Sequence, residues 1–129
     1  MSRRALAYAT APPSTVVAGQ SYTVSVTVTN QSTLLGAPAA YSFVVQFQLF
    51  AQVGAIIGQV DSKSYNVWIG ASGQAHVNYT FTAPATGYNS GYVKVKLLNT
   101  AGTTAVGTTL QSSDFTITAD LIPGGSIGW

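Results

Sequence analysis

The stretch SYTVSVTVTN, residues 21–30, decides the fold class of this chain. Its tyrosine and valines fall on one face, and its serines and threonines fall on the other, in a strict period of two. This alternation predicts a half-buried antiparallel β-strand whose apolar face needs a partner sheet. Other alternating segments can supply that partner, and the clearest of them are 41–51, 74–82 and 91–99.

The remaining candidate strands are shorter and are separated by turn residues. We expect them at 14–18, 53–60, 64–69, 103–106 and 114–119. A turn at Asp61-Ser62-Lys63 is expected to separate two of them. About seven to nine short strands without a helical period indicate an all-β fold, an antiparallel β-sandwich. The domain is expected to span residues 14–120, with an extended arm at 1–13 and a glycine-rich tail at 121–129.

The composition is unusual for its lack of charge. Hydrophobic residues make up 47% of the 129 positions and charged residues only 6%, against about 25% in typical soluble domains. The only acids are Asp61, Asp114 and Asp120. The polar surface must therefore consist of Ser, Thr, Asn and Gln, which respond little to pH or salt. Such a surface is more typical of shells, fibres and cell surfaces than of intracellular enzymes.

Several protein classes are disfavoured by what the sequence lacks. The five cations are scattered and form no nucleic-acid footprint. There is no cysteine for a disulfide or a thiolate metal site. No apolar run approaches the roughly 20 residues of a membrane span. The first residues lack the apolar region of a signal peptide, so we expect either production without Sec export, as for virion proteins, or a processed sequence with a new start.

The residues that could carry chemistry are isolated from one another. His76 is the only histidine, and no acid lies near it in sequence to orient it for hydrolysis. We expect a solvated or interface histidine rather than a zinc ligand. The three aspartates are single, which favours turn or strand-end roles over a calcium site or a glycosidase pair. We therefore predict no enzyme activity, no cofactor and no metal.

Two stretches resemble the immunoglobulin-like modules of bacterial and archaeal surface proteins and of phage virion proteins. One is VAGQ at 17–20 leading into YTVSVTVTN at 22–30, and the other is GQAHVNYTFTAP at 73–84 followed by YVKVK at 92–96. Together they cover about half of the chain, and the Cys pair of antibody domains is absent. The resemblance implies a module that builds, decorates or adheres and that rarely catalyses.

The first functional hypothesis is a structural subunit of an assembly. It would be a virion component (capsid decoration, turret, tail or spike) or a cell-surface filament subunit. Its partners would be other copies of itself or other subunits, packed through uncharged sheet faces and through both arms, which bury too little to order alone. Val44 and Phe50 interrupt a polar face, so a loop or a neighbour should cover it. The interface candidates are Arg3, Arg4, Tyr8, Phe50, Ile122, Ile127 and Trp129.

The second hypothesis is a carbohydrate-binding or cell-adhesion module at a surface. Exposed aromatic rings could form a platform for a sugar, although core and interface packing explains most aromatics in a chain with 11% of them. The platform candidates are Tyr65, Trp68, Tyr88 and Tyr92. Asn30 and Asn78 begin N-glycosylation sequons, which arise often by chance in a chain rich in Thr and Asn.

Overall fold

β-Strands form the regular structure of the chain in a computed structural model that describes residues 4–84, 87–107 and 109–118. No helix occurs within these ranges. The strands are β1 (Arg4–Thr10), β2 (Thr15–Val17), β3 (Ser21–Asn30), β4 (Thr33–Leu34), β5 (Ala37–Pro38), β6 (Tyr41–Val53), β7 (Ile56–Ile69), β8 (Gln74–Thr82), β9 (Ser90–Leu98), β10 (Leu110–Gln111) and β11 (Phe115–Thr118). The predicted all-β class is confirmed.

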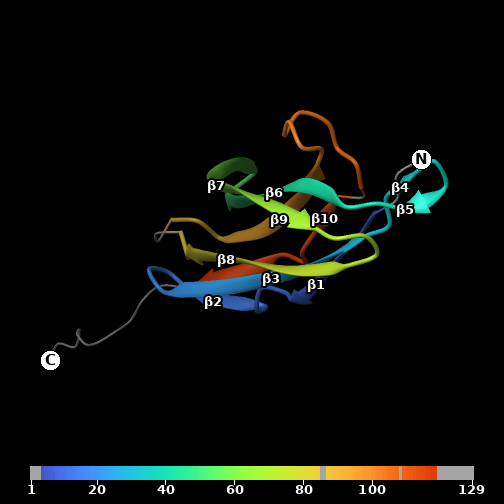
Figure 1. Ribbon diagram of the computed structural model, residues 1–129. Helices are drawn as coiled ribbons and strands as arrows, with labels where there is room; N and C mark the ends of the chain where they lie inside the picture. The colour runs from blue at the N-terminus through green and yellow to red at the C-terminus, as the bar shows by residue number, and fades with distance from the viewer. Residues whose placement is uncertain (1–3, 85–86, 108, 119–129) are drawn as a thin grey trace, which may run out of the picture.

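Two sheets of unequal width face each other across one apolar core. The narrow sheet has the order β1-β3-β8, and the wide sheet has the order β2-β11-β9-β6-β7, with β10 beside β9. Figure 1 shows β1, β3 and β8 in the lower layer and β6, β7 and β9 in the upper one. All pairings among the described strands are antiparallel except that of β2 with β11, which is parallel.

Strand β3 forms the centre of the narrow sheet, and its bounds are those predicted. Val24, Val26 and Val28 are completely buried, and they belong to the same core cluster as Phe43 and Phe47 of the wide sheet. Burial of each valine side chain contributes roughly 1.5–3 kcal/mol. The alternation of residues 21–30 therefore supplies the apolar face on which the wide sheet packs.

The outward face of the narrow sheet is a ladder of uncharged side chains that bond to one another. Four successive pairs from β3 and β8 are hydrogen-bonded: Thr23–Thr80 at 2.8 Å, Ser25–Asn78 at 2.6 Å, Thr27–His76 Nδ1 at 3.0 Å and Thr29–Gln74 at 3.2 Å. The single histidine thus contacts a threonine hydroxyl. We define these eight residues as the polar ladder.

Three expectations about the strands are corrected by the structure. Residues 4–10 are not a free arm, because they pair with β3 from Arg4↔Asn30 to Thr10↔Ser25 and satisfy its backbone groups. Residues 56–69 form one strand, in which residues 61–63, expected as a turn, pair regularly with β6, and a β-bulge precedes them at Val60. Residues 103–106 form no strand; Ala105 makes an isolated antiparallel bridge to Leu98, and the backbone N–H of Val106 donates to the carbonyl of Leu97.

Asn30 at the end of β3 joins three loops through its buried side chain. Its amide nitrogen donates to the carbonyl oxygens of Ala39, Ile69 and Gly70 at 2.9–3.1 Å. Its amide oxygen accepts the backbone N–H of Ser32 at 2.9 Å. A glycan cannot be attached to this nitrogen in the folded state, since it is fully buried and already bonded.

We expect Asn30→Ala to lower the free energy of unfolding by about 2–3 kcal/mol, because it leaves buried carbonyls without a donor. The matched control is Asn78→Ala, which removes one exposed hydrogen bond and should cost about 1 kcal/mol or less. Urea unfolding of both variants measures the difference. Equal losses in the two variants would contradict the structural role of Asn30.

Candidate functional site: the outer edge of strand β7

Strand β7 lies at the edge of the wide sheet and is exposed along most of its length. Nine consecutive residues, 56–64, are exposed on both faces of the strand. Its hairpin partner β6 behaves differently, since Leu49 and Ala51 are 99% buried. The wide sheet overhangs the narrow one at this side, and within the described part of the chain only β6 pairs with β7. The outer backbone edge of β7 is therefore open.

The tip of the β6–β7 hairpin, at the left of Figure 1, carries an exposed apolar cluster. A two-residue loop joins the strands, with Gly54 at φ +58°, as hairpin loops of this length often require. Thirteen residue pairs hold the two strands together. The cluster consists of Val53, Ile56, Ile57 and Val60, which are 41–75% exposed. We call these four residues the hairpin tip.

A β-bulge at Val60 turns Asp61 toward the narrow sheet. Leu49 pairs with Asp61 and Phe50 pairs with Gln59, so Val60 has no partner on β6. The hydroxyl of Tyr79, on β8, donates to the Asp61 carboxylate. Because Tyr79 itself is fully buried, this bond ties the overhanging strand to the core.

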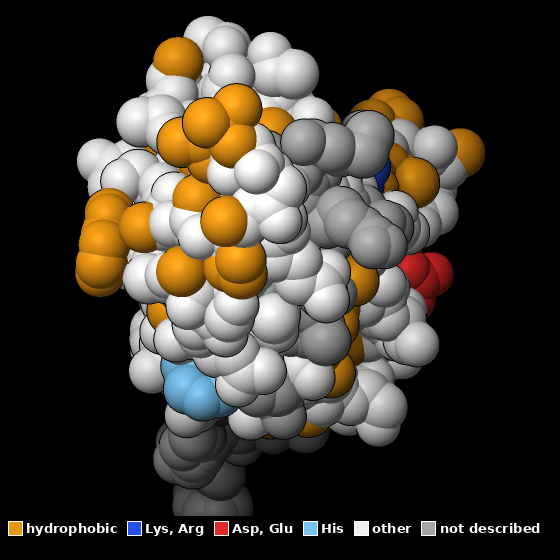
Figure 2. Space-filling view, turned by 45° about the vertical axis from the view of Figure 1, so that its right-hand side comes forward, with side chains coloured by type: hydrophobic (Ala, Val, Ile, Leu, Met, Phe, Trp, Pro, Cys, Tyr) orange, Lys and Arg blue, Asp and Glu red, His pale blue; other side chains and the backbone are white. Residues whose placement is uncertain are grey.

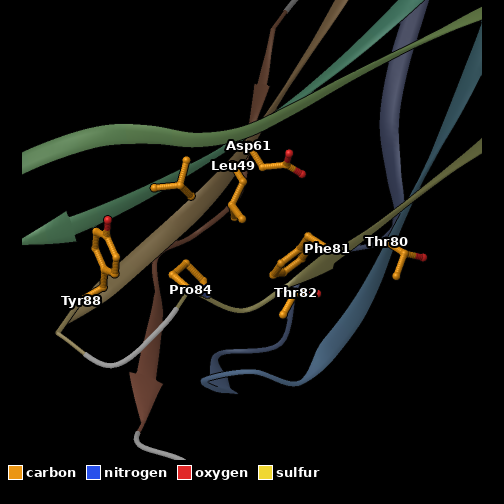
Figure 3. Close-up of a pocket in the computed structure, with 8 residues that line it drawn as sticks. Leu49, Asp61, Thr80, Phe81, Thr82, Pro84 and Tyr88 are labelled. Carbon is orange, nitrogen blue, oxygen red and sulfur yellow. The ribbon is translucent and has the colours of Figure 1, made fainter.

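An open groove of about 470 Å³ runs between β7 and β8. Figure 3 shows Leu49 and Asp61 on one side of it and Phe81, Pro84 and Tyr88 facing them. The lining is completed by Val60, Thr80 and Thr82. The groove therefore mixes apolar side chains with hydroxyl groups, and its lining contains one carboxylate, whereas hydrolysis by a carboxylate pair uses two.

The described residues also lack the groups needed for metal chemistry. They contain no cluster of three or more His, Cys, Asp or Glu side chains that could hold a metal ion. Within the same ranges there is no helix with the length and hydropathy to cross a membrane.

Two buried tyrosines have altered acidity. Burial raises the pKa of Tyr79 well above its usual value, and the hydrogen bond to Asp61 raises it further. Burial also raises the pKa of Tyr8 to about 12. The Tyr8 hydroxyl donates to the carbonyl oxygen of Val93 at 2.9 Å, and its ring packs against the core. Tyr8, expected at a subunit interface, is thus engaged within its own chain.

Of the other interface candidates, Phe50 and Arg4 lie within the described residues. Phe50 stacks on Tyr92 with a ring separation of 5.0 Å, and the Lys94 ammonium lies 5.4 Å from the Phe50 ring. Arg4 belongs to β1. The sequence predicted that either a loop or a neighbouring chain covers Val44. Val44 is 91% buried, and Gly102 of the loop 99–107 lies against it. Arg3, Ile122, Ile127 and Trp129 lie outside the described residues.

The four aromatic residues of the expected sugar platform do not come together. Tyr65 faces inward and packs edge-on against Phe47 at 5.8 Å. Trp68 and Tyr92 both face outward, but they pair with β6 at positions 42 and 50, about 26 Å apart along the strand. Tyr88 lines the groove instead. No common ring platform exists.

The hairpin tip escaped the sequence-based prediction. The segment VGAIIGQV, residues 53–60, was expected to be one of the shorter strands, and its exposure was not predicted. Its lack of polar alternation is the signal that could have marked it, since it fits neither a half-buried strand nor a polar loop.

Two further exposed apolar residues lie at the opposite end of the molecule, on the β4–β5 hairpin. Leu34 is 68% exposed and Leu35 is 98% exposed, with Leu35 in the left-handed region at φ +53°. Figure 2 shows this side, with separate hydrophobic groups among uncharged ones and acidic atoms only at the margin. These leucines are a matched comparison for the isoleucines of the hairpin tip.

No protein-family model matches the chain, and no curated protein matches its sequence. Solved structures of several proteins are similar to it in fold. Three of them are the alkylpurine DNA glycosylase AlkC of Pseudomonas fluorescens (TM-score 0.61, 19% identity), a β-glucosidase of Listeria innocua (0.63, 17%) and a cycloisomaltooligosaccharide glucanotransferase of Paenibacillus sp. (0.52, 19%). The matches cover 84–90% of this chain but only 30%, 16% and 13% of those chains, respectively.

These likenesses concern the fold alone, because the sequence identities are below 20%. In each case the chain corresponds to less than a third of the larger protein. The same strand arrangement therefore occurs as one part of several large proteins, and fold does not imply function.

We expect stability to fall as pH rises above about 10, where the tyrosines of the unfolded chain begin to ionise. Tyr8 and Tyr79 keep their protons to higher pH in the folded state, so the stability they contribute is present below pH 10 and is lost above it. Melting temperatures at about pH 9 and pH 11.5 measure this loss. Tyr8→Phe should show a smaller loss than the parent chain, and an identical loss would contradict the assignment.

Proposed function

We propose that this chain is a non-enzymatic, immunoglobulin-like module that serves in assembly. The strand order supports the immunoglobulin-like part of the proposal. Strands β1, β3 and β8 correspond to A, B and E of that fold, and β2-β11-β9-β6-β7 corresponds to A′-G-F-C-C′.

The observation that carries the proposal is the open edge of β7 next to the apolar hairpin tip. A long exposed edge strand is a template for pairing with another chain, and monomeric proteins usually shorten, cover or charge such edges. Here the strand has 14 residues, its only protection is the bulge at Val60 and the two charges Asp61 and Lys63, and four large apolar side chains are exposed at its hairpin end. Association through this edge would satisfy the backbone groups and bury the cluster.

The setting that we propose is a virion component or a surface filament subunit, in contact with copies of itself or with other subunits. The polar ladder supports it, because an uncharged and internally bonded face repels neighbouring copies weakly. The sequence has only 6% charged residues, which extends the same property to the rest of the surface.

The second candidate function is carbohydrate binding, which the groove between β7 and β8 favours. The Asp61 carboxylate can accept hydroxyl hydrogens, and Tyr88 and Pro84 offer an apolar wall. Glycan-array binding that is lost in Tyr88→Ala with the fold intact would favour this function over assembly.

We expect the purified chain to show a concentration-dependent mass above 13.3 kDa in light scattering after size exclusion. Replacing both Ile56 and Ile57 by serine should shift it toward the monomer, because the contact then buries less apolar area. The control replaces Leu34 and Leu35 by serine and should leave the mass unchanged. A parent chain of 13.3 kDa at every concentration would contradict self-assembly.

A further inference from the structure

We propose that β7 pairs antiparallel with β7 of a second copy, about a two-fold axis at Ser62. The proposal rests on the assembly function above and specifies its contact. Closed two-fold contacts are the commonest in protein oligomers, and they require a surface that is complementary to itself. Strand β7 has this property.

The complementarity lies in the only two charges of the strand. Asp61 and Lys63 flank Ser62 and have opposite signs. Two copies paired antiparallel about Ser62 place Asp61 of each copy directly opposite Lys63 of the other. Both residues face the same side of the sheet, since they pair with alternate residues of β6, Leu49 and Phe47. The symmetry then generates two identical ion pairs.

The same charges oppose the neighbouring arrangements. An axis at Asp61 would place two aspartates opposite each other, and an axis at Lys63 would place two lysines opposite each other. Parallel pairing in register would align both residues with their own copies. Like charges directly across strands are destabilising, and unlike charges are stabilising. Among these arrangements the axis at Ser62 alone pairs opposite charges.

Both charged groups are available for such a contact. Lys63 forms no ion pair within the described residues, and its ammonium lies 5.7 Å from the ring of Tyr65. Asp61 is exposed and accepts one hydrogen bond, from Tyr79. A carboxylate has about four acceptor positions, so it can bind the lysine of a second copy at the same time.

The bulge and the inward charges give the edge its selectivity. Bulges and charged residues on an edge strand normally prevent pairing with arbitrary strands. The bulge at Val60 interrupts the regular part of β7, so pairing about Ser62 is regular over residues 61–63 of both copies and meets the bulge beyond them. An unrelated strand would leave both charges unpaired, whereas a second copy pairs both. The two charges therefore favour pairing of this edge with a second copy over pairing with a strand that lacks the matching charges.

Disulfide trapping tests the position of the axis without touching either charge. The chain has no cysteine, so Ser62→Cys introduces the only thiol. At the axis the two Cα atoms would lie about 4.5–5.5 Å apart, within the range of a disulfide. Mild oxidation should therefore give a covalent dimer. In the control Ser64→Cys, on the same exposed edge, the two cysteines would lie about 13 Å apart, so oxidation should give no covalent dimer. Equal cross-linking of both variants would overturn the proposal.

A charge exchange tests the ion pairs. Lys63→Glu and Asp61→Lys should each raise the dissociation constant by about tenfold or more, because like charges then face each other. A mixture of the two variants should restore association, since every facing pair is again of opposite sign. Tyr79→Phe is the control for the lost hydrogen bond to Asp61, and it should associate like the parent chain.

The outcomes separate this proposal from the assembly function. A parent chain that assembles equally well in both charge variants would overturn the pairing about Ser62 and leave the assembly function standing. A parent chain that is monomeric at every concentration would overturn the assembly function itself.

Discussion

The burial of one valine face between two sheets of unequal width is the constraint on which the rest of the structure depends. The valines of β3 need cover, and β6 and β9 of the wide sheet provide it. The narrow sheet ends at β8, while the wide sheet continues to β7. The overhang that results leaves residues 56–64 of β7 without a facing layer, whereas Ile69 at its end is buried in the core. The bond from Tyr79 to Asp61 is the polar tie between this overhanging strand and the core.

The sequence predicted the bounds of strands that are buried on one face, and it failed for strands that are not. Residues 21–30 and 74–82 were predicted with the bounds that the structure has, because each alternates fully between the core and solvent. Strand β7 was divided in two, because residues 56–64 are exposed on both faces and carry no burial pattern. Asp61-Ser62-Lys63 therefore had the composition of a turn. Residues 4–10 were not predicted as a strand, because β1 consists mainly of small residues and shows no clear alternation of apolar and polar side chains.

The exposed site itself depends on a fact that composition cannot give, namely which strand lacks a partner layer. Ile56 pairs with Val53 and faces the side of the narrow sheet, which stops short of it, whereas Ile57 pairs with Gln52 and faces the outer side of the wide sheet. Both side chains are exposed. Tyr8 shows the reverse case. It lies in a segment that was expected to contact a neighbouring subunit, yet its hydroxyl donates a hydrogen bond to the carbonyl of Val93 in its own chain. The alternation of residues in the sequence therefore predicts that a segment is a strand. Its position in the two sheets determines which of its side chains are exposed.

The two-residue loop of the β6–β7 hairpin has a consequence for the order of folding. The hairpin is local and can close in about 1–10 μs. The polar ladder joins side chains 45 to 57 residues apart in sequence, and such distant pairing is slower because a long loop must close first. We therefore expect the hairpin to form before the layer that it overhangs. The edge that the finished molecule exposes would then be available to other copies from the earliest stage of folding, so refolding yield should depend on chain concentration.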